Sequence, residues 1–357
     1  MKILVLGAGV IGVSTAWFLS KAGHDVTVLD RQDSPGKETS FANGGQISAG
    51  QAEPWANPAA PAKIVKWLGR EDAPLLFRLR ADASQWSWGL KFLLECLPSR
   101  THQNTLQTLK LAVFSREKLK EVREETGLVY DGVERGILTL HTDQKEFKLA
   151  QTRLQMLREH GVSVNVRSPS QVLEIEPALK QSKVEIVGAT HAEDDESGDA
   201  FLFTQRLAEV AGKNGVAFGF GVEVIDWQVK GSRINSILAR VGDRLETFSA
   251  DAFVVALGSY TTLSLSKLGI NIPVFPVKGY SVTIPISDSD LAPEVCITDE
   301  NGKVAISRLG ARLRAAGTAE LAGYDLAIRE ERCQAIVNLS LIHISEPTRP
   351  LYISYAV

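Results

Sequence analysis

The sequence is poor in the residues that mark disulfide-rich and metal-binding proteins. Only three cysteines occur among its 357 residues, and Cys96, Cys296 and Cys333 are far apart. With no recognisable signal peptide at the N-terminus, we expect reduced, buried thiols and a cytoplasmic location. The six histidines show neither H-x-x-x-H spacing nor a nearby cysteine pair, so a metal site has no support.

Long apolar runs and a strong excess of one charge are also missing. No run of about 18 apolar residues occurs, which argues against a membrane-spanning helix. With a net charge of −3, the chain lacks the excess of basic residues that is typical of nucleic-acid-binding proteins, so we expect no nucleic acid as a partner. With 44% hydrophobic residues, the chain is long enough to form two globular domains.

A glycine-rich turn near the N-terminus carries the strongest pattern. An apolar run at residues 2–6 leads into G-x-G-x-x-G and then into a helix to about Lys21. Three glycines allow a tight bend, a close approach of backbone N–H groups to a pyrophosphate, and close packing of helix on strand. The helix N-terminus adds a positive dipole end. The predicted dinucleotide contacts here are Leu6, Gly7, Gly9, Val10, Ile11 and Gly12.

A second strand, at residues 25–30, ends in an acid. Asp30 stands where a carboxylate would bind the ribose hydroxyls of an adenosine. The same carboxylate would repel a 2′-phosphate, even though Arg31 follows it. The pattern therefore predicts FAD or NAD, against the alternative of a glycine-rich packing turn.

Residues 38–50 form a polar, glycine-rich stretch that is too long for a surface turn. We predict that it wraps the rest of the dinucleotide, with Ser40 at phosphate oxygens and residues 43–46 at the edge of a ring. The alternative is an ordinary solvated loop. The predicted contacts are Thr39, Ser40, Asn43, Gly44, Gly45 and Gln46.

These motifs together resemble those of a known family. The opening turn, Asp30, the stretch Glu38-Thr39-Ser40-x-Ala42-Asn43-x-Gly45-Gln46-Ile47-Ser48 and the later Pro276-Val277-Lys278-Gly279-Tyr280-Ser281 are similar to the small (FAD) subunits of bacterial D-amino-acid dehydrogenases. Those subunits belong to the glutathione-reductase-like FAD oxidoreductases, with D-amino-acid oxidase, glycine oxidase and sarcosine oxidase. The resemblance extends to about Asn338.

The resemblance implies an α/β fold with two domains. A glutathione-reductase-like FAD-binding domain, with a parallel sheet and a three-stranded β-meander crossover, is expected at residues 1–53 and 193–271. An α+β substrate domain with an antiparallel sheet is expected at residues 54–192 and 272–338. The meander strands fall at residues 222–230, 234–240 and 245–249, and the family places Val222 and Gly258 against the dinucleotide.

The second half of the substrate domain offers candidate substrate contacts. We expect strands at residues 280–286, 304–307 and 312–316 to form a sheet over the flavin. Tyr280 is a candidate substrate contact, with simple packing as the alternative. Arg308, Arg312 and Arg314 are candidates for a carboxylate clamp, with solvated hairpin charges as the alternative.

Residues 54–97 mix tryptophan with lysine and arginine. We expect Trp86, Leu90, Leu93 and Leu94 to form one packed helix face. The alternative is a surface that contacts anionic lipid, which would place the protein peripherally on the inner face of the cytoplasmic membrane. Further helices are expected at residues 106–126, 143–160 and 327–338.

After Asn338 the sequence departs from the resemblance. The family continues into a G-x-R-P-x-x-P-D-G stretch and a glycine-rich segment that covers the flavin ring, and neither is found here. Residues 339–357 resemble translated sequencing-adapter read-through. We therefore expect a non-native tail that does not pack, an open cleft beside Gly44 and Gly258, and a chain that is inactive as it stands.

The activity implied by the resemblance is oxidative deamination of D-amino acids to 2-oxo acids and ammonia. Hydride passes from the substrate to FAD, and a quinone-type acceptor takes the electrons. Positioning supplies most of the rate, which suits a sequence with no catalytic triad or carboxylate pair. The alternatives are a glycine, sarcosine or proline amine oxidase of the same fold, or a non-catalytic nucleotide-binding fragment.

Overall fold

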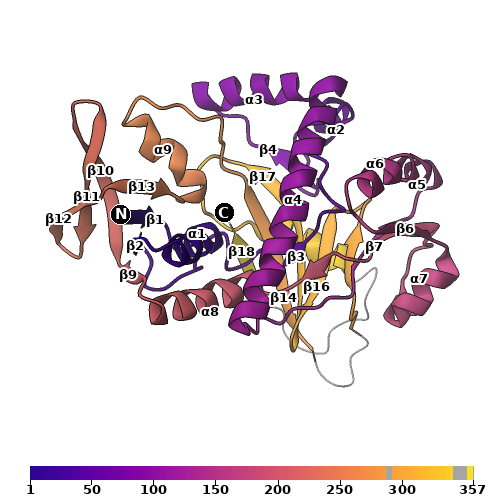
Figure 1. Cartoon of the computed structure of the whole chain (residues 1–357). Helices are drawn as coiled ribbons and strands as arrows, with labels where there is room; N and C mark the ends of the chain where they lie inside the picture. The colour runs from indigo at the N-terminus through magenta and orange to yellow at the C-terminus, as the bar shows by residue number, and fades with distance from the viewer. Residues whose placement is uncertain (287–291, 341–351, 357) are drawn as a thin grey trace.

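The computed structural model describes residues 1–286, 292–340 and 352–356. Its elements form two groups that lie side by side in Figure 1. A small parallel sheet and a three-stranded meander lie on the left, and a large mixed sheet lies on the right. Helix α4 (Pro98–Thr126) connects the groups, since Val122 packs into the core of the first and Leu109 into a cluster of the second.

The parallel sheet has the strand order β13-β1-β2-β9. Its strands are β1 (Lys2–Leu6), β2 (Asp25–Asp30), β9 (Ala217–Phe220) and β13 (Ala252–Val255). Helices α1 (Val10–Lys21) and α8 (Ala200–Lys213) cover one face through Val13, Trp17, Phe203 and Leu207. Because the sheet is covered on both faces, by these helices and by the meander, β1 is a continuous apolar run.

The opposite face of this sheet packs against the meander. Strands β10 (Val222–Lys230), β11 (Arg233–Val241) and β12 (Arg244–Ser249) are antiparallel, and each begins and ends within one residue of its predicted bounds. Leu4, Leu29, Trp227 and Ile237 form the core between the two sheets. The short helix α9 (Thr261–Ser266) follows β13.

The large sheet has the order β18-β14-β17-β16-β15-β5-β7-β6, with β4 (Leu75–Phe77) also paired to β17. Neighbours are antiparallel except β15 with β5 and β17 with β4. The other strands are β5 (Ile137–His141), β6 (Val164–Arg167), β7 (Gly188–Ala192), β14 (Lys278–Pro285), β15 (Cys296–Asp299), β16 (Val304–Leu309), β17 (Arg312–Leu321) and β18 (Tyr352–Ala356). The predicted fold class, a parallel sheet with a meander crossover beside a second, largely antiparallel sheet, is confirmed.

One face of the large sheet is apolar and covered by helices. Val282, Ile306 and Leu313 pack there against α7 (Pro169–Ile175) and α10 (Glu330–Ser340). Cys333 of α10 lies in this core, and all three cysteines are free and buried, as predicted.

Two helix predictions need correction. Helix α4 begins at Pro98 rather than near residue 106, because proline at the first helical position has the required φ and lacks only an N–H that would be unpaired there. Residues 143–160 form two helices, α5 (Gln144–Gln151) and α6 (Leu154–Glu159). Phe147 packs against the His141 ring, whereas Leu154 joins a separate cluster with Ala52. One straight helix would not place both side chains in these two packing sites.

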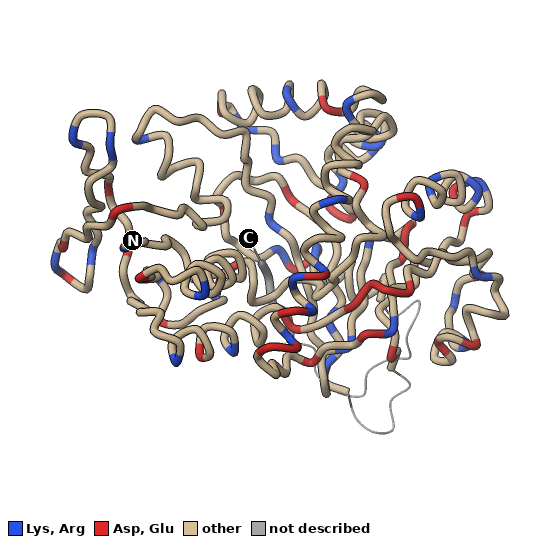
Figure 2. The backbone as a smooth tube through the Cα atoms, in the orientation of Figure 1, with Lys and Arg blue, Asp and Glu red and all other residues tan. Residues whose placement is uncertain are grey.

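Four apolar side chains of α3 (Ala83–Glu95) are exposed, contrary to the expected packed face. Trp86, Leu90, Leu93 and Leu94 are 55%, 65%, 48% and 54% exposed. In Figure 2 the tube of α3, along the upper edge, is mostly tan, because Lys91 and Glu95 are its two charged residues. With the neighbouring α2 (Ala60–Trp67), which has no buried residue, α3 forms what we call the α2–α3 surface.

The expectation that residues 339–357 do not pack is wrong for the part that the structure describes. Ser340 is the buried end of α10, and Leu339 packs against the core. Residues 352–356 form β18, which pairs with β14 from Thr283↔Tyr352 to Gly279↔Ala356. The pairing satisfies backbone groups that an edge strand would leave open. Residues 341–351 and Val357, also part of this expectation, lie outside the described residues.

Candidate functional site

The glycine-rich turn joins β1 to α1 and admits no larger residue at two positions. Gly7 has φ +104°, and a Cβ there would lie 2.4 Å from the carbonyl oxygen of Ala256. A Cβ on Gly12 would lie 1.8 Å from the oxygen of Gly7. The turn therefore brings the N-terminus of α1 directly onto the ends of β1 and β13. Among the described residues, no atom accepts a hydrogen bond from the N–H groups of Gly9, Ile11 or Gly12.

Asp30 ends β2 beside this turn. Its Oδ2 accepts a hydrogen bond from Ala8 N at 2.6 Å, and its Oδ1 accepts one from Gln32 N at 2.8 Å. Each carboxylate oxygen keeps a further lone pair for a ligand. The neighbouring Arg31 pairs with Glu38 at 2.6 Å and lies over the Tyr260 ring at 4.0 Å.

Ser40 caps α1 from the following loop. The N-cap residue Gly9 has no side chain, and Ser40 Oγ accepts a hydrogen bond from Val10 N at 3.0 Å. Asn43 holds the same loop in a turn, because its Oδ1 accepts from Gly45 N at 2.8 Å. The loop is thus fixed against the glycine-rich turn instead of lying free in solvent.

These elements enclose a cleft of about 720 Å³, which is in the usual range for small-molecule and cofactor sites. The predicted residues that line it are Gly7, Gly9, Val10, Ile11, Asp30, Arg31, Thr39, Ser40, Asn43, Val222 and Gly258. They come from five parts of the chain, so the fold brings together most of the set that the sequence indicated. The open cleft beside Gly258 was also expected.

Five predicted residues lie outside the lining of this cleft. Leu6 is buried in β1, and Gly12 lies inside α1. The other three lie beside the large sheet: Gly44 O accepts from Ser307 Oγ at 2.7 Å, a Cβ on Gly45 would lie 3.4 Å from the Leu309 side chain, and Gln46 Nε2 donates to Thr298 Oγ1 at 2.8 Å. An opening beside Gly44 is therefore not part of this cleft.

Sequence reasoning named only Val222 and Gly258 from one wall of the cleft. It is made by β10, by the segment after β13 and by residues 274–277. Trp227 Nε1 donates to Ser264 O at 3.0 Å, which joins β10 to α9. The apolar run between Pro273 and Pro276 could have drawn attention to this wall, because its prolines limit it to an extended segment.

Asp195 holds the segment after the Asn43 loop. Its buried carboxylate accepts hydrogen bonds from Ser48 Oγ at 2.5 Å and from Ala49 N and Gly50 N at 3.0 Å. Arg116 approaches it to 3.3 Å. Burial raises the pKa of Asp195 although these hydrogen bonds oppose the shift. Nearby, β3 (Gln46–Ile47) pairs with β8 (Glu196–Ser197).

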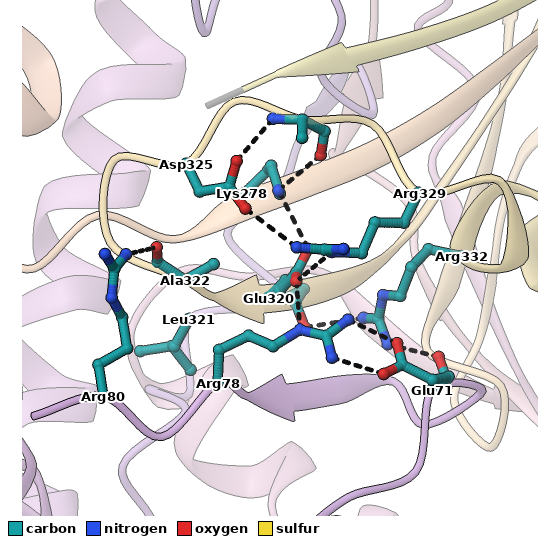
Figure 3. Close-up of polar contacts among 12 residues, drawn as sticks. Glu71, Arg78, Arg80, Lys278, Glu320, Leu321, Ala322, Asp325, Arg329 and Arg332 are labelled. Carbon is teal, nitrogen blue, oxygen red and sulfur yellow. Dashed lines mark hydrogen bonds and ion pairs between the residues drawn. The ribbon is translucent and has the colours of Figure 1, made fainter.

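Glu320 of β17 lies at the centre of a buried polar network (Figure 3). It accepts hydrogen bonds from Arg78 Nε at 2.7 Å, Arg329 Nε at 3.1 Å and Tyr280 Oη at 2.6 Å, and lies 3.2 Å from Lys278 Nζ. Burial by itself raises the pKa of Glu320, but these donors outweigh it and the pKa falls to about 2.

The network corrects the expectation for Tyr280. Its side chain is buried, its hydroxyl is bound to Glu320, and it is absent from the cleft lining. Burial and the adjacent carboxylate raise the pKa of this phenol. The structure thus assigns Tyr280 a packing role in place of a substrate contact.

The three candidate clamp arginines differ in their partners. Arg308 is partly exposed, and its Nε donates weakly to Gly310 O at 3.4 Å. Arg312 pairs with Asp199 at 2.8 Å and Asp131 at 3.4 Å. Arg314 is only 5% exposed and contacts no carboxylate among the described residues.

Within residues 1–286, 292–340 and 352–356, no group of three His, Cys, Asp or Glu side chains is placed to hold a metal ion. In this part of the chain, no helix combines the length and apolar character needed to cross a membrane.

Comparison with known proteins decides the family. The sequence profile described as FAD dependent oxidoreductase matches residues 2–342. The chain belongs to the FAD dependent oxidoreductase family. A relative from Dechloromonas aromatica (strain RCB), named D-amino acid dehydrogenase, is 49% identical over 339 residues, which cover 95% of this chain and 81% of the relative.

Two solved structures share the fold of this chain. L-Proline dehydrogenase from P. horikoshii matches with a TM-score of 0.71 at 18% identity, covering 99% of this chain and 80% of that one. Glycine oxidase from Geobacillus kaustophilus matches with a TM-score of 0.70 at 21% identity, covering 99% and 82%. At such identities the likeness is one of fold alone.

The cleft fits the cofactor of the FAD dependent oxidoreductases. Backbone N–H groups without protein acceptors lie at the N-terminus of α1, where a pyrophosphate would be bound. The carboxylate of Asp30 lies at the end of β2, where it would bind ribose hydroxyls. FAD bound here would supply the redox chemistry, and the chain would supply its position.

Proposed function

We propose that this chain oxidises D-amino acids to 2-oxo acids and ammonia with FAD held in the 720 Å³ cleft. The observation that carries the proposal is the 49% identity, over 95% of this chain, to a protein named D-amino acid dehydrogenase. The glycine-rich turn, Asp30 and Ser40 support it, since they form a fitted dinucleotide site.

The chain's own residues act by positioning. The turn and Asp30 fix the nucleotide end of the cofactor, and residues 42–46 lie between the cleft and the polar face of the large sheet. Bound in this cleft, FAD would supply the acceptor for the hydride that leaves the α-carbon of the substrate. Holding substrate and cofactor in one geometry lowers the barrier without a dedicated nucleophile.

The test is anaerobic reduction of the bound flavin. The purified chain, loaded with FAD, is mixed with D-alanine or with L-alanine, and the absorbance of oxidised flavin is followed. We expect D-alanine to bleach it and L-alanine to do so far more slowly. Equal rates for both enantiomers, or no bleaching by any D-amino acid, would refute the proposal.

For the electron acceptor, we propose a quinone rather than dioxygen. The name dehydrogenase, carried by the relative, supports this choice. A soluble ubiquinone analogue should then support faster turnover than air-saturated buffer. Rapid peroxide formation without an added acceptor would favour an oxidase instead.

Contact with a membrane would bring the protein to a quinone. The α2–α3 surface supports a peripheral location on the inner face of the cytoplasmic membrane, since Trp86 and Leu90 are exposed on α3 and the exposed helix α2 carries Lys63 and Lys66. Apolar side chains flanked by cations suit the boundary of an anionic bilayer.

The same test distinguishes two alternative functions. The fold likeness to glycine oxidase and L-proline dehydrogenase favours a panel that includes glycine, sarcosine and L-proline. A preference for one of these would change the substrate and keep the cofactor. A stable flavin spectrum without reduction by any substrate would point to a non-catalytic nucleotide-binding chain.

A further inference from the structure

Three aromatic rings join α3 to the wall of the cleft. Trp88 and Phe92 are four residues apart and share one face of α3. The centroid of the Trp88 ring lies 5.3 Å from that of Phe92 and 5.5 Å from that of Phe275. Phe275 itself lines the cleft. In Figure 1 the segment that follows α9 passes beside α3, and these three rings, which we call the aromatic row, lie at this contact.

The cleft wall next to the aromatic row is apolar and partly exposed. Residues 268–277 contain no charged side chain. Leu263 and Val274 line the cleft and are 48% and 43% exposed, and the rings of the aromatic row are half-buried. Apolar surface that stays exposed at the edge of a ligand cleft is typical of a binding site for an apolar molecule.

The aromatic row also offers a hydrogen-bond donor. The indole Nε1–H of Trp88 reaches solvent and has no acceptor among the described residues. By contrast, Trp86 Nε1 on the same helix donates to Arg80 O at 3.0 Å. An indole N–H can only donate. The row therefore combines stacked rings with a donor that is available to an oxygen atom from outside the chain.

The chemistry of the aromatic row suits a quinone better than an amino acid. An amino acid carries an ammonium and a carboxylate at neutral pH, and both groups are costly to move from water to an apolar surface without partners. None of the three side chains of the row is charged. A quinone is uncharged and planar, so its ring can stack on aromatic side chains while a carbonyl oxygen accepts a hydrogen bond.

We propose that the aromatic row is the docking site of the quinone acceptor, with the quinone ring against Trp88 and Phe275 and a carbonyl oxygen bonded to Trp88 Nε1. The inference rests on the proposed function, which requires an acceptor that reaches the cofactor in the cleft. At this site the quinone gains two electrons and two protons and leaves as the quinol. The reduced cofactor, which carries both, returns to its oxidised form.

The place of the aromatic row also agrees with the proposed membrane contact. The exposed Trp86 and Leu90 of the α2–α3 surface lie on a different face of α3 from Trp88 and Phe92. A bilayer at that surface would lie within about one helix diameter of the row. A quinone from the bilayer would then reach the cleft wall by passing α3.

The test measures quinone binding without turnover. Duroquinone, a fully substituted benzoquinone that does not alkylate thiols, is titrated into the FAD-loaded chain in a calorimeter, with no vesicles present. Trp88→Leu should weaken its binding about 5- to 50-fold, because a stacking contact and a hydrogen bond are both lost. Trp88→Phe keeps a ring but not the donor, so its affinity should fall between those of Trp88→Leu and the original chain.

Trp86→Leu is the matched control, because Trp86 is on the same helix and its Nε1 already donates to Arg80 O. This variant should bind duroquinone like the original chain. FAD affinity is measured for every variant and should stay within about threefold. That measurement separates loss of the quinone site from a change in the cleft wall.

A second measurement follows electron transfer without an amino acid. The bound flavin is reduced with dithionite, excess reductant is removed, and the chain is mixed with duroquinone or with ferricyanide. Trp88→Leu should slow reoxidation by dilute duroquinone about 5- to 50-fold, in step with the lost affinity. Reoxidation by ferricyanide should be unchanged, because this hydrophilic anion does not bind in an apolar site.

The outcomes separate the inference from the proposed function. Unchanged duroquinone binding in Trp88→Leu, an equal loss in Trp86→Leu, equal slowing of both oxidants, or no duroquinone binding by the original chain would each overturn the docking site. Trp88-dependent binding and reoxidation in a chain whose flavin no D-amino acid reduces would keep the docking site and refute the proposed function. Reduction by D-amino acids without Trp88-dependent duroquinone binding would refute the docking site alone.

Discussion

Asp30 Oδ2 accepts a hydrogen bond from the backbone N–H of Ala8 at 2.6 Å, so the last residue of β2 faces the glycine-rich turn after β1. The two residues are 22 positions apart in the chain. Their contact places a carboxylate and the N-terminus of α1 on the same cleft, and this arrangement is what a dinucleotide requires.

Substitution of Asp30 should weaken FAD binding. We expect Asp30→Ala to lower the binding free energy by about 1.5–3 kcal/mol, the usual value of a hydrogen bond to a charged group. Titration with FAD, followed by flavin fluorescence, measures the change. Asp33→Ala is the control, because Asp33 is exposed and its contacts are an ion pair with Lys37 and a hydrogen bond from Ser34. Equal affinities for both variants would rule out the assigned role of Asp30.

A methyl group at Gly12 should disrupt the packing of α1 on β1. The added Cβ would lie 1.8 Å from Gly7 O, and overpacking of this kind costs about 1–3 kcal/mol or more. Thermal unfolding should show a lower Tm, and FAD binding should be lost. Gly212→Ala in α8 is the control, because its Cβ would have no neighbour nearer than 4.0 Å. That change should raise stability by about 0.5–1 kcal/mol. A similar loss of stability in the Gly12 and Gly212 variants would contradict the packing argument.

The Glu320 network should make the fold sensitive to acid. Because its folded pKa of about 2 lies below the ordinary glutamate value of about 4.3, ionised Glu320 stabilises the fold above that value. This contribution is lost as the pH falls from about 4 to 2. Glu320→Gln should cost about 3–5 kcal/mol at neutral pH, because it leaves Arg78 and Lys278 short of a counterion.

Urea unfolding at neutral pH and near pH 3 measures this dependence. Glu71→Gln is the control, because Glu71 also pairs with Arg78 but is partly exposed, and it should cost about 0–1 kcal/mol. In Glu320→Gln the loss of stability on acidification should be smaller than in the original chain. An unchanged acid dependence would show that Glu320 is not its source.

The α2–α3 surface should bind anionic vesicles. We expect the double change Trp86→Ser and Leu90→Ser to reduce flotation with phosphatidylglycerol vesicles several-fold. Stability should change by no more than about 0.5 kcal/mol, because both side chains are exposed. Leu111→Ser with Phe114→Ser, which are equally exposed on α4, should leave flotation unchanged. If both pairs acted alike, the effect would reflect general hydrophobicity and not this surface.

The sequence by itself determined the parts of the fold that depend on local chemistry. The turn at Gly7 and Gly12 could be predicted because no residue with a side chain fits there. The meander bounds could be predicted because Gly231 and Gly242 adopt positive φ at its two tight turns. The family resemblance likewise rested on short motifs with a physical reason for each residue.

Only the tertiary structure decided the roles of side chains that depend on distant partners. Arg312 and Arg314 are alike in the sequence, yet one meets Asp199, 113 positions away, and the other meets Asn43, 271 positions away. Trp86 and Leu90 fit a packed helix face by their spacing, but no element among the described residues covers them fully, and they are 55% and 65% exposed. Periodicity shows which side chains share a face, whereas strand register and domain packing determine what that face contacts.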